Sequence, residues 1–396
     1  MNCLGLVLSG GAARGAYAAG VMRYLLGELP RHLGRVPWPD IVTGSSVGAL
    51  NGVFAAARSL DAMQRLTAIW RDMTIDDVYR LEARGLVRTL RATWAAASGT
   101  ALFDAAPLHA LVERVAPLDA LRRAIDSRAL RSFIVSATQV DSGIHVLFVD
   151  SAMQALRLDP LPLSRISRVH ITARHLLASA ALPFAFPPIE IEGVWYVDGG
   201  LRQNTPLRPA VMAGASRVIV VGTTAERETP PGIRHPELTP NLPFLAGKTL
   251  NALLADPVER DLRATDQVNA IVAWGTSVYG PGFARRLEAD LGMRPVETLF
   301  IRPSEDLGCL AAETWRRHPP PVPRQVAWLL STIADRANAS DGESDLLSYL
   351  LFDRAFTAEV EEIGFQDARR REAELVRFVG EHPPPTAAAV AASSGG

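Results

Sequence analysis

Short apolar runs alternate along this chain with longer stretches in which apolar residues recur every three or four positions. The first run, residues 4–8, ends at a Ser-Gly-Gly sequence and predicts a buried strand. Residues 13–27 have helical spacing, residues 40–43 predict a second strand, and residues 47–58 predict a helix of small side chains. This strand–helix–strand–helix order is typical of a parallel sheet covered by helices on both faces.

The same alternation continues through the rest of the chain. Apolar runs predict further strands at residues 132–138, 143–149, 194–197, 217–221 and 297–302. Helical patterns occupy residues 60–121, 172–181, 244–273 and 345–379. Pro257 is expected to break or to start a helix. Because one strand comes as late as residues 297–302, we expect a single continuous sheet with the C-terminal helices packed on it.

Composition allows a large folded core and excludes one class of partner. The chain has 396 residues, of which 48% are hydrophobic, so one large α/β domain or two smaller ones can form. It carries 41 basic and 42 acidic residues, a formal net charge of −1. A nucleic-acid-binding protein would show a basic surplus, so no nucleic-acid partner is expected.

Cysteine content and hydropathy narrow the setting further. Cys3 and Cys309 are the two cysteines, and neither belongs to a CxxC pair, so we expect neither a metal site nor a disulfide framework. Cys3 lies in an apolar run, which predicts a buried free thiol. No apolar stretch reaches the roughly 18 residues that a spanning helix needs. The first apolar run is too short for a signal peptide, and a cytoplasmic location is the expectation.

The first chemical motif is Gly44-Ser45-Ser46-Val47-Gly48, a G-x-S-x-G sequence between a predicted strand and a predicted helix. In that context the serine occupies a sharp turn that exposes its hydroxyl, and only glycine fits two places before and after it. The helix that follows directs N–H groups toward developing negative charge. Taken alone, the motif fits a plain strand-to-helix turn equally well.

A glycine-rich turn follows the first predicted strand. Residues 9–15 read Ser-Gly-Gly-Ala-Ala-Arg-Gly, and Ala12 stands where a dinucleotide fingerprint requires glycine. An oxyanion hole made by N–H groups at a helix start fits better. This turn and the one at Ser46 end neighbouring predicted strands, so both would open on the same sheet edge. Arg14 is expected to be structural, with lipid headgroup contact as the alternative.

Asp198 ends another apolar strand and precedes Gly199 and Gly200. By itself this sequence is most simply an ordinary Asp-Gly turn. A strand terminus can, however, bring an acidic side chain close to the terminus of another strand. The elbow at Ser46 follows only the second strand, whereas in an ordinary α/β hydrolase it follows several.

An ordinary hydrolase triad also needs a histidine after the acid. The three candidates lie in or beside proline-rich segments or the tail, and none is well placed: His235, His318 and His382. The five earlier histidines belong to no motif and are expected to have surface or structural roles: His32, His109, His145, His170 and His175.

Taken together and in this order, the motifs resemble the patatin-like phospholipase family. Residues 10–15 match its G-G-G-x-R-G motif with alanine at the third glycine, residues 44–48 match its G-x-S-x-G, and residues 198–200 match its D-G-G/A. Supporting similarity lies at residues 178–188, 204–207 and 345–368. The resemblance covers residues 4–225 well, and the ordered set is far more specific than any single motif.

The resemblance implies an α/β fold with three α/β/α layers, a central mostly parallel sheet and C-terminal helical segments. It implies Ser46 as nucleophile, Asp198 as general base, and an oxyanion hole at Gly10, Gly11 and Ala12. Six further residues would support the motifs: Arg14, Gly15, Gly44, Gly48, Gly199 and Gly200. Alanine keeps its N–H but loses the freedom of glycine at positive φ, so the loop geometry is expected to differ slightly. No metal or cofactor is required.

The implied activity is hydrolysis of lipid acyl esters, of the phospholipase A or lysophospholipase type, through an acyl-enzyme. Two alternatives stay open, an acyltransferase that uses the same intermediate and a silent lipid-binding module. Apolar residues between Leu176 and Phe186 fit either an acyl site or the core. Any membrane contact is expected to be peripheral.

Three regions are expected along the chain. Residues 1–225 form the patatin-like core, residues 226–380 form a C-terminal extension packed on the same domain, and residues 381–396 form a disordered tail rich in Pro, Ala, Ser and Gly.

Overall fold

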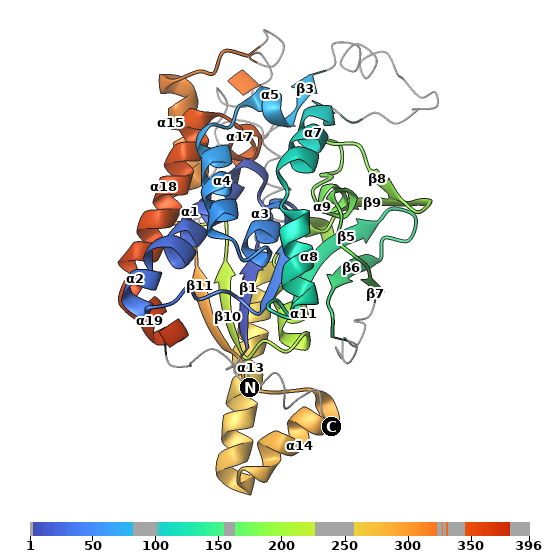
Figure 1. Cartoon of the computed structure of the whole chain (residues 1–396), viewed down its shortest axis with the longest axis vertical. Helices are drawn as coiled ribbons and strands as arrows, with labels where there is room; N and C mark the ends of the chain where they lie inside the picture. The colour runs from blue at the N-terminus through green and yellow to red at the C-terminus, as the bar shows by residue number, and fades with distance from the viewer. Residues whose placement is uncertain are drawn as a thin grey trace, which may run out of the picture.

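A mostly parallel sheet forms the centre of the protein (Figure 1). The computed structural model describes residues 3–81, 101, 103–153, 163–225, 257–322, 327, 330–331 and 345–380. The main sheet path runs in the order β11 (Glu297–Ile301), β10 (Arg217–Val221), β1 (Leu4–Leu8), β2 (Ile41–Ser45), β5 (Ser132–Gln139), β6 (His145–Asp150) and β7 (Ser164–Arg168). The first five of these strands are parallel, and β6 is antiparallel to β5.

Two further strands, β9 (Val194–Asp198) and β8 (Ile189–Ile191), extend the sheet at the end of β5. β9 pairs antiparallel with the end of β5, and β8 pairs antiparallel with β9. Because β9 runs backwards, its last residue reaches the edge where β2 and β5 end.

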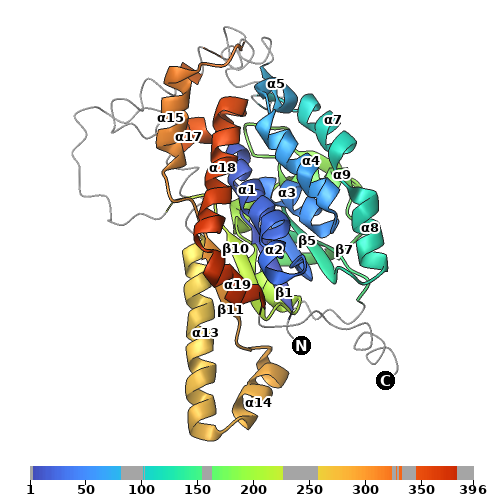
Figure 2. The same ribbon diagram turned by 60° about the vertical axis from the view of Figure 1, so that its left-hand side comes forward.

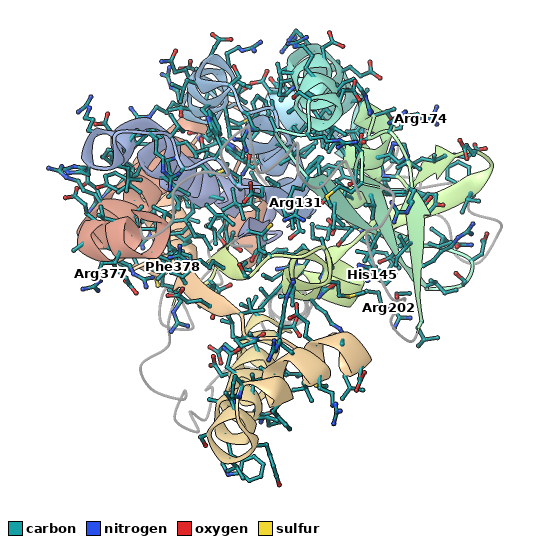
Figure 3. All side chains as sticks on the ribbon, turned by 60° about the horizontal axis from the view of Figure 1, so that its bottom comes forward. Arg131, His145, Arg174, Arg202, Arg377 and Phe378 are labelled. Atoms are coloured by element: carbon teal, nitrogen blue, oxygen red, sulfur yellow. The ribbon has the colours of Figure 1, made fainter. Side chains whose placement is uncertain are left out.

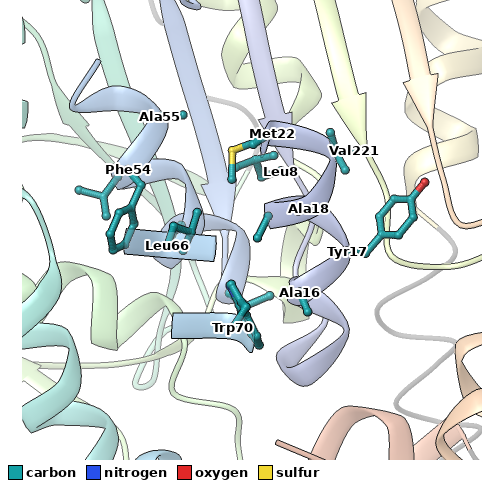
Figure 4. Packing of buried hydrophobic residues seen from close by; sticks show 14 of the residues in the cluster. Leu8, Ala16, Tyr17, Ala18, Met22, Phe54, Ala55, Leu66, Trp70 and Val221 are labelled. Carbon is teal, nitrogen blue, oxygen red and sulfur yellow. The ribbon is translucent and has the colours of Figure 1, made fainter. Parts of the chain in front are cut away.

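Both faces of the sheet are buried, which explains the continuous apolar runs in the sequence. Successive side chains of a strand point to opposite faces. Leu6 and Leu8 of β1 accordingly join one hydrophobic cluster, and Val7 between them joins the other. Figure 4 shows Leu8 packed in the larger cluster beside Met22.

Helices cover the two faces and complete the three-layer α/β/α arrangement predicted from the sequence. The larger cluster lies under α1 (Ala16–Arg23), α3 (Val47–Ala56), α4 (Leu60–Arg71), α8 (Leu118–Asp126) and α18 (Arg354–Arg370). The smaller cluster lies under α11 (Leu207–Met212) and the start of α13 (Pro257–Tyr279). Figure 2 shows α18 alongside α1, although the two are far apart in sequence.

The remaining elements are short or peripheral. Those before β5 in the chain are η1 (Ala12–Gly15), η2 (Tyr24–Glu28), α2 (Pro30–Leu33), α5 (Ile75–Val78), β3 (Arg80–Leu81), β4 (Phe103–Asp104) and α7 (Ala106–Val115). Those after it are α9 (Ala173–Ser179), α10 (Gly200–Gln203), α14 (Gly282–Leu291), α15 (Leu307–Arg317), α17 (Asp345–Leu350) and α19 (Glu372–Gly380). Helices α13 and α14 extend away from the body (Figure 1).

Helix α19 lies beside the start of β10. The guanidinium of Arg217, at the start of β10, lies 4.7 Å from the centroid of the Phe378 ring. Phe378 is labelled in Figure 3, which views the molecule from this end. The contact joins the start of a central strand to the last described helix.

The sequence predicted most of these elements but missed some strands, among them one at the edge of the sheet. The predicted strand at residues 217–221 is found unchanged, and the predicted helix at residues 13–27 is divided into a 3-10 turn, an α-helix and a π-helical turn. Strand β7 was not predicted, because its sequence Ser-Arg-Ile-Ser-Arg contains a single apolar residue and it occupies a sheet edge. The expectations for residues 226–256 and 381–396 lie outside the described residues, as do His235 and His382.

Candidate functional site

Ser46 occupies a strained turn between β2 and α3. Its φ of 54° lies in the left-handed region, which costs a non-glycine residue on the order of 1–2 kcal/mol. A Cβ on Gly44 would lie 2.4 Å from the carbonyl oxygen of Gly48, and a Cβ on Gly48 would lie 2.2 Å from that of Leu8. Both contacts are with backbone, so the turn accepts only glycine at these two positions, as the motif predicts.

Asp198 is brought beside Ser46 by the antiparallel strand β9. Asp198 pairs with Ala137 of β5, and Ser45 pairs with Ser136 of the same strand. Because β6 pairs with the other side of β5, β2 and β9 lie on the same side of it, and their last residues meet there. Asp198 accepts a hydrogen bond from the Ser46 hydroxyl and is 1% exposed.

Burial dominates the electrostatics of Asp198. Removal from water raises the pKa of its carboxyl from 3.8 to about 6. The Ser46 hydroxyl and the Gly200 N–H, which donates at 2.7 Å, stabilise the carboxylate and limit this rise. The group is therefore mostly ionised at neutral pH, yet it is a stronger base than an aspartate in water.

The glycine-rich turn faces the same site from the end of β1. Gly11 and Ala12 line the cavity at Ser46, and in the described part of the chain no protein group accepts from their N–H groups. Alanine at position 12 was expected to change the loop geometry, because alanine disfavours positive φ. Ala12 nevertheless has a φ of 49°, so the turn keeps a left-handed conformation there. Two N–H groups are thus available to a negatively charged oxygen.

Gly10 differs from its neighbours and corrects the sequence-based expectation. Its N–H donates to the carbonyl oxygen of Asn204 at 3.1 Å, so it is not free to hold an oxyanion. Its own carbonyl accepts from Thr223 Oγ1 at 2.8 Å and from Asn204 Nδ2 at 3.4 Å. Gly10 therefore anchors the loop, and the pattern of glycines alone could not separate an anchor from a donor.

Arg14 points into the protein, which supports the structural role predicted for it. Its side chain is buried, with 3% of its surface exposed. Nε donates to Ser348 Oγ at 2.7 Å, Nη1 donates to the Tyr349 hydroxyl at 3.3 Å, and the guanidinium lies 4.2 Å from the centre of the Tyr349 ring. The residue joins the glycine-rich turn to α17 rather than reaching a ligand in solvent.

The other glycines of the motifs pack closely. A Cβ on Gly15 would lie 2.4 Å from a methyl group of Val47, and a Cβ on Gly199 would lie 2.4 Å from the backbone oxygen of Ser136. Gly200 contributes the N–H that Asp198 accepts. These residues bring the loop, the elbow and the acid together, and none of them lines the cavity within the described chain.

Ser179 supports the site, and the sequence analysis did not single it out. Its hydroxyl accepts from the N–H of Ser46 at 2.9 Å and donates to the carbonyl oxygen of Ser136 at 2.6 Å. It thereby fixes the strained turn to β5 and α9. Its position within residues 178–183, a stretch similar to the family, was the available signal.

Ser46 and Asp198 are both in the wall of a mostly apolar cavity. The cavity has a volume of about 90 Å³. Leu176, Leu182 and Phe186 are in its wall, so at least part of the apolar stretch between Leu176 and Phe186 faces a cavity rather than only the core. An apolar group that entered this cavity would lie beside Ser46.

The described residues contain no cluster of three or more His, Cys, Asp or Glu side chains suited to a metal ion. Among the residues that line the cavity in the described chain there is no histidine. None of the described helices is long and apolar enough to cross a membrane. Cys3 is a buried free cysteine, as predicted, and Cys309 lies at the surface.

Comparison with known proteins agrees with the fold and with the order of the motifs. A sequence model of the patatin-like phospholipase family matches residues 6–211, more than half of the chain. The chain therefore belongs to the patatin-like phospholipase family, which is a family of lipid hydrolases. None of the curated proteins matches the chain.

Among solved structures, the chain is similar to VipD from Legionella pneumophila. The sequences are 11% identical, the TM-score is 0.37, and the match covers 94% of this chain and 67% of VipD.

Proposed function

We propose that this protein is a serine acyl hydrolase that cleaves carboxylic ester bonds of lipids with a Ser46–Asp198 dyad. One observation carries the proposal: Ser46, whose backbone is strained, donates its hydroxyl hydrogen bond to the fully buried Asp198 carboxylate beside an apolar cavity. A serine needs an adjacent base to become a nucleophile, and a carboxylate needs burial to become an adequate base.

The reaction begins when Asp198 takes the hydroxyl proton as Ser46 Oγ attacks the ester carbonyl. Negative charge develops on the carbonyl oxygen and is held by the N–H groups of Gly11 and Ala12. These donors are fixed before the reaction, and loss of one such donor typically lowers the rate about 10²–10³-fold. The proton then passes from Asp198 to the departing alcohol, which leaves an acyl-enzyme on Ser46.

Water completes the cycle. Asp198, deprotonated again, accepts a proton from a water molecule as its oxygen attacks the acyl-enzyme. The second tetrahedral intermediate uses the same N–H groups, and its collapse returns the proton to Ser46 and releases the fatty acid. Both half-reactions use the same two side chains, because the carboxylate lies against the hydroxyl throughout.

Three matched variants test the dyad. Ser46→Ala and Asp198→Asn should each lower kcat/KM for a soluble carboxylic ester by at least about 10³-fold. Ser45→Ala is the control, because the neighbouring hydroxyl is buried and has no partner within the described chain. Its removal should leave the rate within about twofold. Near-wild-type hydrolysis by Ser46→Ala, with unchanged thermal unfolding, would contradict the proposal.

Covalent labelling gives an independent measurement. A fluorophosphonate should modify the wild type and the Ser45→Ala variant at Ser46, identified by peptide mass spectrometry, and should not modify Ser46→Ala. A folded wild-type protein that resists the reagent and hydrolyses no ester would instead be a silent binding module.

A further inference from the structure

Helices α13 and α14 form a hairpin that projects from the end of the sheet opposite Ser46. Asn269 of α13 fixes it there: Nδ2 donates to the carbonyl oxygen of Val296 at 2.8 Å, and Oδ1 accepts from the N–H of Val296 at 2.9 Å. Val296 directly precedes β11, so this pair lies where the parallel strands begin, whereas Ser46 follows the end of β2. The part of α13 after Asn269 therefore extends past the sheet (Figures 1 and 2).

The inner face of this hairpin is well packed. Val272 of α13 is buried, and a Cβ on Gly275 would lie 2.1 Å from the Phe283 ring of α14. Arg294, which follows α14, donates from Nη2 to the carbonyl oxygen of Val211 at 2.6 Å and so ties the second arm to the body. The hairpin is therefore held at the base of both arms, and its two helices share a small core.

The outer face of α13 is apolar and exposed beyond Asn269. The side chains of Ile271, Trp274, Val278 and Tyr279 are each more than half exposed, and the rings of Trp274 and Tyr279 lie 6.0 Å apart between centroids. Residues 267–284 contain no Asp, Glu, Lys or Arg. A helix that is apolar on both faces is normally buried on both, so this exposed patch calls for a partner.

The exposed positions of α13 recur with a definite period. Exposed residues at Ala264, Gln267, Ile271, Trp274 and Val278, which we name the α13 stripe, are separated by three, four, three and four positions. Such intervals repeat every seven residues, and this repeat is the pattern by which two α-helices pack along their length. A flat lipid surface imposes no such repeat. The period therefore favours another helix as the partner.

We propose that the α13 stripe pairs with the α13 stripe of a second copy of this chain, antiparallel about a two-fold axis at Ile271. Val278 then faces Ala264 of the other copy, and Trp274 faces Gln267, so each large side chain meets a smaller or more flexible one. The sheet end of the stripe carries a hollow that can receive the large side chains. Its lining in the described part of the chain is Arg260, Arg263, Ala264 and Gln267.

Charge selects the antiparallel direction. In a parallel pair, Arg260 and Arg263 would each face their own copies, and like charges repel. In the antiparallel pair, Arg263 instead faces Tyr279 of the second copy, whose ring attracts a guanidinium group. Arg263 keeps its ion pair with Glu259 of its own helix, whose atoms lie 3.2 Å apart. A two-fold pairing also uses one patch twice, which is the commonest way in which a chain forms an oligomer.

The size of the patch sets the strength of the dimer. Since an aromatic side chain buries about 150–250 Å², the exposed parts of Ile271, Trp274, Val278 and Tyr279 amount to roughly 450 Å² in each copy. With the polar end of the stripe, two copies would bury roughly 1,000 Å² or slightly more, the lower limit for a specific interface. We therefore expect a dissociation constant on the order of 10 μM.

Light scattering coupled to size-exclusion chromatography tests the dimer. Between about 1 and 200 μM, the wild type should change from one chain to two, whereas Trp274→Glu should stay monomeric because it puts a charge into the stripe. Leu60→Glu is the matched control, since it changes an exposed apolar residue at the start of α4 and should dimerise like the wild type. Circular dichroism should show the same folded state for all three.

The inference is independent of the proposed function. The hairpin and Ser46 lie at opposite ends of the sheet, so Trp274→Glu should hydrolyse a soluble ester at the wild-type rate per chain. A wild type that dimerises through Trp274 but cleaves no ester would overturn the hydrolase and keep the dimer.

Cross-linking measures the direction of the pairing. With Cys309→Ser as the background, Ile271→Cys should form a disulfide between copies under mild oxidation, because residue 271 lies on the axis. Ala264→Cys should form none, because the two copies of residue 264 lie about 21 Å apart along an antiparallel pair. Efficient cross-linking through residue 264 would show a parallel pair and would overturn the antiparallel arrangement.

Two further results would overturn the dimer. One is a wild type that stays monomeric up to about 200 μM, and the other is a Trp274→Glu variant that dimerises as well as Leu60→Glu. Flotation with vesicles of phosphatidylcholine and phosphatidylglycerol identifies the competing occupant. A monomeric wild type that floats with these vesicles, beside a Trp274→Glu variant that does not, would assign the stripe to a membrane surface instead.

Discussion

At the residue scale, the proposed site holds several groups in unfavourable states. Ser46 and Ala12 adopt positive φ, and Asp198 is buried without a positively charged neighbour among the causes of its pKa shift. Such strain persists only when the surrounding structure imposes it. Here Ser179 fixes the backbone of Ser46, and Gly200 donates to Asp198.

The raised pKa of Asp198 predicts the pH dependence of the reaction. The base must be ionised, so kcat/KM for a soluble ester should fall tenfold per pH unit below a pKa near 6 and level off above it. A rate profile between pH 4 and 8 on an ester without ionisable groups measures this. A midpoint near 4, the value of an exposed aspartate, would contradict a buried base.

The raised pKa of Asp198 also makes the stability of the folded protein depend on pH. Because the folded chain holds the Asp198 proton more tightly than the unfolded chain, the contribution of this group to stability is greatest at low pH and falls as pH rises through about 6. Asp198→Asn should therefore unfold at a temperature equal to or above that of the wild type at pH 8, which also serves as its folding control.

At the element scale, the contact between α1 and α18 holds the glycine-rich turn at Gly11 and Ala12 in place. Tyr17 donates to Asp367 at 3.1 Å, and Arg23 donates to Glu361 at 2.6 Å. The helices approach closely because glycine lies where they cross: a Cβ on Gly364 would lie 2.1 Å from the backbone oxygen of Tyr17. Helix α1 continues directly from η1, so this contact positions Gly11 and Ala12.

Gly364→Ala should therefore separate the two helices and lower both stability and turnover. We expect a loss of at least about 2 kcal/mol in the free energy of unfolding, from overpacking against backbone, and a lower kcat/KM. Gly27→Ala is the matched control, because Gly27 is an exposed helical glycine with nothing within 4 Å of the added Cβ. Equal unfolding midpoints for the two variants in urea would show that the crossing tolerates a methyl group.

At the scale of the whole molecule, we propose that residues 226–380 fold together with residues 1–225. Strand β11 extends the central sheet beside β10, and α17 contacts the glycine-rich turn through Arg14. Phe356 and Val360 of α18 are fully buried in the larger hydrophobic cluster. The helices that follow the glycine-rich turn and the turn at Ser46 thus share one core with α18.

Truncation tests this arrangement. A chain that ends at residue 344 would expose the apolar surface of α1 and leave Arg14 without Ser348 and Tyr349. We expect it to lose cooperative unfolding and all esterase activity, as followed by circular dichroism and ester hydrolysis. A folded and active fragment would show that the C-terminal helices form a separate unit.

The sequence by itself determined the layered fold and singled out Ser46 and Asp198, which the structure places side by side. A strand that is buried on both faces needs a run of apolar residues, and the strained turn at Ser46 needs glycine on either side. Both requirements are local, so the sequence alone shows them. Tertiary structure alone decided that Gly10 is an anchor, that Ser179 fixes the turn at Ser46, and that an apolar cavity lies beside Ser46. These depend on hydrogen bonds and packing between residues far apart in sequence, and residue type does not encode which partner a group will meet.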